Sequence, residues 1–382
     1  MDDIVENTVG ETAAKTAARA FGSPFRYIQG PGVFERLDVF AREYSDSIFL
    51  LIDGTVYEDI TKSLNSIFRG SSTGVATERF AGQCSEAEVG RVTALAKKSG
   101  AGIVAGVGGG KTLDTAKCAA NELGAALFII PTSASTDAPT SAMSVLYKDT
   151  GEHSHSIRHR RGPDLVLVDS LIISKAPIRL FVAGMGDALS TIYEARANHL
   201  SDTANYIDRG YRRCMAGMAV AEMCHKVLME DGFAAKTALE RGELNLAVEN
   251  VIEANILLSG LGFENTGCAA AHAIHTGFSE LKESHGFYHG EIVSFGVVFQ
   301  LILENAPEEE LSEVLAFCHS VGLPVTLGQL GVAATPENIS IIADRVMDGN
   351  SGVDAEPFPV TRELVYNAIF EADAAGRRAA GA

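Results

Sequence analysis

The sequence predicts an α/β N-terminal domain with a Rossmann-like, doubly wound sheet, followed by an all-α C-terminal domain. In the first half, short apolar runs alternate with helical patterns, and after Pro177 the strand patterns end. Runs that are apolar on both faces are typical of parallel strands covered by helices on both sides, and their alternation with helices predicts a doubly wound sheet. The four predicted strands are residues 47–53, 102–107, 126–130 and 164–169.

Two of the intervening helices are predicted at residues 85–99 and 113–123. A chain of 382 residues is too long for one ordinary compact core, which also favours two domains. We therefore predict domains at residues 1–177 and 178–382, and interpret residues 1–20 as a loosely ordered extension. A cleft between two unlike domains is a common place for a ligand site.

The composition excludes several classes of function. A net charge of −18 argues against nucleic-acid binding, which requires a basic face. The six cysteines form no CxxC pair, so we expect reduced, buried thiols. The acidic N-terminus does not resemble a signal peptide, and we find no apolar run long enough to span a membrane. We expect a cytoplasmic protein with no membrane or nucleic-acid partner.

The strongest local pattern is a glycine-rich turn at residues 106–112, GVGGGKT, between a predicted strand and a predicted helix. Gly108, Gly109 and Gly110 let the backbone approach a phosphate, and the helix N-terminus offers free N–H groups. The P-loop pattern fails because Ala105 stands where its first glycine belongs, and no frame of GxGxxG fits. We interpret the turn as a pyrophosphate site; a tight turn without a ligand is the alternative.

Two further polar features follow predicted strands. Asp53 could accept both ribose hydroxyls of an adenosine and repel a 2′-phosphate, although a strand-ending Asp is often only a turn former. Residues 131–139, PTSASTDAP, gather hydroxyls around Asp137. They suggest a polar wall near a nicotinamide, with a solvated Ser/Thr loop as the alternative.

Histidines are concentrated in the second half. Asp187 begins a helical stretch, His272 and His275 share a helical face, and His285 and His289 follow. An Asp with two His ligands suits a zinc ion that keeps one position open for a substrate oxygen. By spacing alone, a histidine in such a position is more often structural than a metal ligand. The run HSHSIRH, with His153, His155 and His159, is interpreted as a polar hairpin or loop rather than a metal site.

Taken together, the motifs GVGGGKTLDTAK, IIPTSASTDAPTSAMSVLY, GMGDALS, AAAHAIHTG and FYHGE resemble the glycerol dehydrogenase branch of the iron-type alcohol dehydrogenase superfamily, from about Tyr27 into the final helices. The resemblance implies one zinc ion per subunit on Asp187, His272 and His289, and a substrate hydroxyl held by Asp137. It also implies a homo-oligomer, commonly an octamer. The cofactor residues predicted for NAD are Asp53, Gly108, Gly109, Gly110, Lys111, Asp114, Thr132, Ser135, Ser141, Met143 and Tyr147.

One position separates the branches of this superfamily. Iron-type relatives carry a fourth ligand, a His one helical turn after the Asp, where this chain has Thr191. Three ligands favour zinc, and His275 is then a pocket residue near the metal. Met143, where a leucine is usual, and the polar Ser133 and Thr140 are small departures that bear on the substrate.

The resemblance implies reversible oxidation of glycerol, or a similar vicinal diol, to the hydroxyketone. The metal would lower the pKa of the hydroxyl, and a hydride would pass to NAD. Two alternatives are a dehydroquinate synthase-like lyase and a glycerol-phosphate dehydrogenase, whose phosphorylated substrates need several cations near the motifs. A non-catalytic NAD-binding or assembly protein is a third; it would be expected to have lost a metal ligand.

Overall fold

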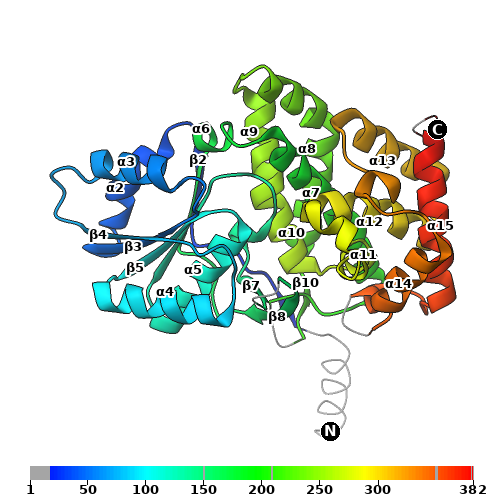
Figure 1. Ribbon diagram of the computed structural model, residues 1–382, viewed down its shortest axis with the longest axis horizontal. Coiled ribbons are helices and arrows are strands. Elements are labelled where there is room, and N and C mark those ends of the chain that lie inside the picture. Colours follow the sequence, from blue (N-terminus) through cyan, green and yellow to red (C-terminus); the bar gives the residue numbers. More distant parts are fainter. Residues whose placement is uncertain (1–17, 149–150, 208–209, 349–351, 380, 382) are drawn as a thin grey trace, which may run out of the picture.

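The computed structural model describes residues 18–148, 151–207, 210–348, 352–379 and 381. Its N-terminal half is built on a six-stranded parallel sheet with the strand order β2-β9-β6-β5-β3-β4 (Figure 1). The strands are β2 (Tyr27–Gly30), β3 (Ser47–Ile52), β4 (Gly74–Arg79), β5 (Ile103–Gly108), β6 (Ala126–Pro131) and β9 (Leu165–Asp169).

Helices cover both faces of this sheet, and alternate residues of β3 enter two different cores. Leu50 packs in the core on the side of α3, whereas Phe49 and Leu51 pack on the side of α4 and α5. The second core continues without a break into the C-terminal helices. The helices of this half are η1 (Val33–Arg36), α2 (Leu37–Ala41), α3 (Tyr57–Ile67), α4 (Glu86–Ser99), α5 (Gly110–Leu123), η2 (Ala138–Thr140) and α6 (Ser170–Ile173).

The C-terminal half is helical and is arranged around α7 (Ile178–Ser201), which packs mainly against α8, α10 and α12 (Figure 1). Seventeen residues of α7 are buried, so this helix is apolar around most of its circumference. The other helices are α8 (Met215–Glu240), α9 (Leu246–Glu253), η3 (Ala254–Leu258), α10 (Ser259–Thr266), α11 (Ala270–Phe278), η4 (Lys282–Gly286), α12 (His289–Leu303), α13 (Glu308–Val321), η5 (Gly328–Leu330), α14 (Pro336–Val346), η6 (Val353–Ala355) and α15 (Arg362–Ala379).

The predicted fold class is confirmed, and the four predicted strands correspond to β3, β5, β6 and β9. The prediction missed β2 and β4, which lie at the two edges of the sheet. Edge strands have one partner and a more exposed surface, so they need not be apolar; β4, with the sequence GVATER, has no buried residue.

Two small sheets complete the structure. The antiparallel pair of β7 (Met143–Tyr147) and β8 (His153–Arg158) confirms a hairpin for the HSHSIRH run. In the other, β1 (Arg19–Ala20) pairs in parallel with β10 (Arg212–Arg213). Most of the expected N-terminal extension, residues 1–17, lies outside the described residues, but the end of it is held in β1 rather than loosely ordered.

One continuous helical stretch, Leu246–Thr266, is long and apolar enough to cross a membrane by length and composition, with a mean hydropathy of 1.3 over its best window. Charged residues such as Glu249 and Glu253 interrupt this stretch, so it is not an uninterrupted apolar run. In the structure 56% of that window is buried. Val251, Ile252 and Ile256 belong to the core shared with α7 and α8, so the apolar character of this stretch is explained by packing within the protein.

Candidate active site

The glycine-rich turn joins β5 to α5, and its geometry leaves room for a ligand. A Cβ added at Gly109 would meet no atom within 4 Å. At Gly108, in contrast, a Cβ would lie 2.7 Å from the Cβ of Asp53 and 3.0 Å from that of Thr112. No side chain caps the N-terminus of α5, so its first N–H groups remain available to an anion. The turn is therefore suited to hold a phosphate group against backbone donors.

Asp53 lies at the end of β3, directly beside this turn. Its Oδ1 accepts hydrogen bonds from the N and Oγ1 of Thr55, at 2.9 and 2.6 Å, and its Oδ2 accepts one from Thr112 Oγ1 at 3.2 Å. The carboxylate therefore stabilises a local turn, as the alternative interpretation of a strand-ending Asp predicted. It also fixes the first turn of α5, and its contact with a ribose remains a prediction.

The predicted cofactor residues after the turn separate into two groups. Lys111 and Tyr147 face each other, with Lys111 Nζ 4.9 Å from the centre of the tyrosine ring. Burial lowers the pKa of Lys111 and raises that of Tyr147 to about 12. Asp114 points into the protein instead, where its Oδ2 accepts a hydrogen bond from Val145 N at 2.9 Å. Asp114 thus fixes β7, and its predicted contact with the cofactor remains a prediction.

Lys117 organises the segment that carries Ser141 and Met143. Its side chain is fully buried, and Nζ forms an ion pair with Asp114 Oδ1 at 3.1 Å. The same ammonium donates to the carbonyl oxygens of Ala138 and Met143, at 2.6 and 2.7 Å, and lies 3.4 Å from Ser141 Oγ. A buried ammonium is tolerated only when its donors are paired. Lys117 therefore fixes the backbone at the cofactor side of the site.

The segment 131–139 is largely buried and is fixed to the helical half, so it is not a solvated loop. Thr132 N donates to Gly108 O at 3.1 Å, and the hydroxyls of Ser133 and Ser135 lie 3.1 Å apart. Asn255 Nδ2 donates to Ala134 O at 3.0 Å. This segment connects the glycine-rich turn with the helical half, which carries the predicted metal ligands Asp187, His272 and His289.

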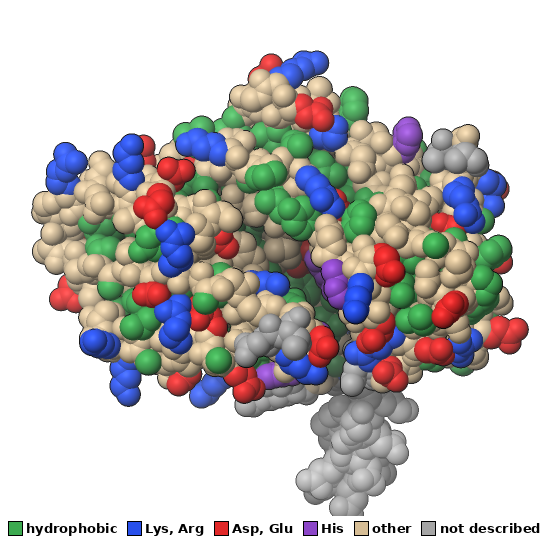
Figure 2. All heavy atoms as spheres, in the orientation of Figure 1, with side chains coloured by type: hydrophobic (Ala, Val, Ile, Leu, Met, Phe, Trp, Pro, Cys, Tyr) green, Lys and Arg blue, Asp and Glu red, His purple; other side chains and the backbone are tan. Residues whose placement is uncertain are grey.

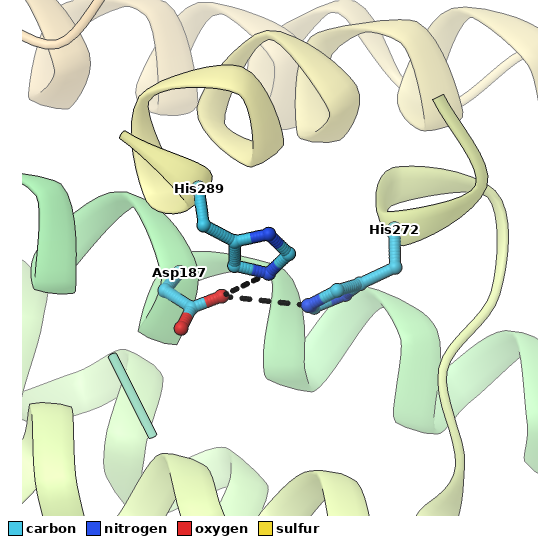
Figure 3. Close-up of side chains that lie close together, drawn as sticks. All are labelled: Asp187, His272 and His289. Carbon is cyan, nitrogen blue, oxygen red and sulfur yellow. Dashed lines mark ion pairs between the residues drawn. The ribbon is translucent and has the colours of Figure 1, made fainter. Parts of the chain in front are cut away.

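Asp187, His272 and His289 come together from α7, α11 and α12 (Figure 3). The Nε2 atoms of both histidines face the same oxygen, Asp187 Oδ1, at 3.4 and 3.3 Å. This oxygen is buried and makes no hydrogen bond with any of the described residues. Burial would raise the pKa of Asp187, but the neighbouring histidines lower it below the ordinary value. Figure 2 shows a hollow between the two halves of the molecule, and a histidine side chain is visible in it.

These donors fit a divalent metal. A tetrahedral ion with ligands at about 2.0–2.1 Å places neighbouring ligand atoms about 3.4 Å apart, which matches both nitrogen-to-oxygen distances. The unpartnered Asp187 Oδ1 provides a second reason, because a buried carboxylate oxygen normally has a partner. Asp137 lies next to the cluster, and its N donates to Asp187 Oδ2 at 3.2 Å.

The remaining histidines are placed differently. His285, in η4, is exposed, and its Nε2 contacts Ser279 O at 3.1 Å. His275 is near the cluster, with its ring 4.4 Å from that of His289. Burial lowers the pKa of His275 well below its ordinary value. His159 Nε2 is 2.8 Å from Ser144 Oγ, so it helps to close the β7–β8 hairpin.

The sequence reading missed Glu194, which supports His272 from behind. This fully buried carboxylate lies two helical turns after Asp187 on α7. Its Oε2 is 2.7 Å from His272 Nδ1, and its Oε1 accepts from Ala269 N and His272 N, both at 2.8 Å. With Nδ1 engaged as a donor, Nε2 is left to bind a metal. The i, i+7 spacing of two acids in an apolar helix was the available signal.

Comparison with known proteins identifies the family to which the chain belongs. Residues 24–170 match the model of the iron-containing alcohol dehydrogenase family. The chain is 42% identical to a glycerol dehydrogenase of Citrobacter freundii, over 93% of this chain and 97% of that protein. It is also 39% identical to a glycolaldehyde reductase of Halobacterium salinarum, over 94% and 98% of the two chains.

Among solved structures, a probable glycerol dehydrogenase from Sinorhizobium meliloti has a TM-score of 0.90 at 44% identity, covering 94% of this chain and 99% of its own. The chain therefore belongs to the iron-containing alcohol dehydrogenase family and is an oxidoreductase. Within that family, it is similar over nearly its whole length to glycerol dehydrogenases.

Proposed function

We propose that this protein oxidises glycerol, or a similar small vicinal diol, to the hydroxyketone, using NAD and one zinc ion per subunit. The observation that carries this proposal is the three-donor cluster of Asp187, His272 and His289 with Asp137 directly beside it. One carboxylate and two imidazoles leave a position open for an alcohol oxygen. The high identity to glycerol dehydrogenases supports the same substrate.

In this proposal a divalent metal on the cluster supplies a Lewis acid that lowers the pKa of an alcohol hydroxyl, and NAD supplies the hydride acceptor. The chain contributes binding and orientation. Asp137, only 7% exposed, accepts a hydrogen bond from a hydroxyl next to the one that reacts. Lys117 holds the segment against which the nicotinamide would lie, and the turn at Gly109 binds the pyrophosphate.

Zinc is proposed over iron because Thr191, one turn after Asp187, offers no imidazole to a fourth coordination position. Phosphorylated substrates are not favoured, since the relatives reported above that match almost the full chain are a glycerol dehydrogenase and a glycolaldehyde reductase. We also propose that residues up to 177 bind NAD and that the helices from residue 178 hold metal and substrate. Assembly as a homo-oligomer, up to an octamer, and a cytoplasmic location are further parts of the proposal.

The test is a panel of substrates assayed with purified protein. NAD reduction is measured with glycerol, propane-1,2-diol and glycerol 3-phosphate, and NADH oxidation with dihydroxyacetone and glycolaldehyde. The proposal predicts the highest kcat/KM for the glycerol and dihydroxyacetone pair. Faster turnover of glycolaldehyde than of dihydroxyacetone would move the assignment to an aldehyde reductase, and faster turnover of glycerol 3-phosphate would refute it.

A further inference from the structure

Two buried hydroxyls form a chain that ends on Asp137. Ser259 Oγ lies 2.8 Å from Asp137 Oδ2, and Thr191 Oγ1 lies 3.0 Å from Ser259 Oγ. Ser259 is fully buried and Thr191 is 2% exposed. The three residues come from separate parts of the chain: the start of α10, the middle of α7 and the segment before η2.

The number of available hydrogens decides which group donates in each of these two hydrogen bonds. Ser259 Oγ donates to Asp137 Oδ2, and a hydroxyl has only one hydrogen to donate. Thr191 must therefore be the donor to Ser259 Oγ. The described residues form no hydrogen bond with the other oxygen, Asp137 Oδ1. The carboxylate is thus held through one oxygen while the other stays available.

The backbone around Ser259 is built for close approach to both partners. A Cβ added at Gly260 would lie 1.9 Å from Thr140 Oγ1 and 2.6 Å from Asp137 O, so only glycine lets α10 come this near to the segment. A Cβ at Gly262 would lie 2.3 Å from the Cγ2 of Thr191. The π-helical turn η3 directly precedes Ser259, and such turns are frequent at functional sites.

We propose that Ser259, held by Thr191, positions Asp137 so that its free oxygen receives the second hydroxyl of the substrate, which makes this pair a determinant of the preference for vicinal diols over simple alcohols. The inference rests on the proposed function. It also gives Thr191 a role of its own: the position that supplies a fourth metal ligand in iron-type relatives here orients the substrate-binding carboxylate.

The experiment compares Ser259→Ala and Thr191→Val with the wild type on glycerol and on propan-2-ol, which lacks a neighbouring hydroxyl. Thr191→Val keeps the methyl group that contacts α10 and removes only the donor. Thr266→Val is the matched control, because its hydroxyl is also buried on α10 but donates to Gly262 O. Bound metal, NAD affinity and thermal unfolding are measured for each variant.

We expect Ser259→Ala to reduce the ratio of kcat/KM for glycerol to that for propan-2-ol roughly tenfold, mainly through a higher KM for glycerol. Thr191→Val should reduce it about threefold, and Thr266→Val should leave it unchanged. Unchanged ratios in both variants, with wild-type preference for glycerol intact, would overturn this inference alone. A wild type without any preference for glycerol would overturn both the inference and the proposed function. If Ser259→Ala does not fold, Thr191→Val decides.

Discussion

The glycine-rich turn and the cluster of Asp187, His272 and His289 are built in different ways. At the turn, residues consecutive in sequence offer backbone N–H groups, and an added Cβ at Gly109 meets open space. In the cluster, side chains from three helices converge on one buried oxygen, and 85 residues separate Asp187 from His272. The turn is therefore local and visible in the sequence, whereas the cluster exists only once the helices have packed.

This difference also predicts how the two regions respond to substitution. A residue of the turn can change without disturbing its neighbours if the added atoms enter only ligand space. A residue of the cluster is supported by other buried groups, as Glu194 supports His272, so changes behind the ligands also alter the site. Substitutions in and behind the cluster should therefore affect catalysis more than substitutions at the turn.

The largest effect is expected at His289, compared with His285 four residues earlier. His289→Ala removes one of three donors, so it should lose bound metal and lower kcat by roughly 1000-fold or more. His285 is exposed on η4 and should tolerate Ala with full metal content and most of the rate. Elemental analysis beside a rate assay decides; metal lost from the His285 variant and kept in the His289 variant would reverse the assignment.

A smaller effect is expected at Glu194, which touches a ligand but not the proposed metal position. Glu194→Gln can present its NH₂ group to His272 Nδ1 and so disfavour the required tautomer; we expect metal affinity to fall by about 10- to 100-fold. Chelator competition on the purified protein measures this without turnover. Glu356→Gln is the control, because Glu356 accepts from Ala270 N on the same helix and contacts no proposed ligand. Equal affinities in the two variants would contradict a positioning role.

At the turn, Gly109→Ala should fold normally and weaken NAD binding by about tenfold, because the new methyl group occupies the space proposed for the pyrophosphate. Gly108→Ala should instead lower stability, since its Cβ would meet Asp53 and Thr112. Gly90→Ala, exposed on α4 with open space around it, is the control for adding a methyl group. The measurements are NADH fluorescence titration and thermal unfolding; unaltered NAD affinity in Gly109→Ala would place the cofactor elsewhere.

The smallest effect on catalysis is expected at Glu264, whose Oε1 accepts from Ala142 N at 2.7 Å. Burial raises its pKa to about 7 from an ordinary 4.5. The folded state therefore holds this proton more tightly, and the stability it contributes is complete below pH 4.5 and lost as pH rises through 7. Glu264→Gln cannot ionise, so it should be more stable than the wild type at pH 8, by at most about 3 kcal/mol.

Urea unfolding of both proteins from pH 4 to 8 tests this expectation, and the difference between them should grow over that range. Parallel curves at all pH values would show that Glu264 does not carry the proton in the folded protein.

The parts of the molecule that could be predicted are those whose signal is local. The strand β5, which is apolar on both faces, and the glycine-rich turn after it are each recognisable from consecutive residues. The metal ligands Asp187, His272 and His289 were predicted from the family resemblance. The exposed strand β4 was missed because an edge strand requires little apolar surface. Glu194 and Ser259 were missed because their partners lie 78 and 122 residues away in the sequence. Lys117 was missed because two of its acceptors are backbone carbonyl oxygens of a later segment, which leave no mark in the sequence. The ion pair of Asp114 with Lys117 was also not predicted, and the contact of Asp114 with the cofactor remains a prediction.

The most direct test of the central claim, a three-ligand metal site on which diol oxidation depends, is removal and return of the metal. Chelated protein should bind NADH almost as well as the untreated protein, because the turn and the cluster lie on different elements, yet it should not oxidise glycerol. One equivalent of zinc per subunit should restore the rate. If chelated protein, shown to be metal-free, still oxidises glycerol at the untreated rate, the account is wrong.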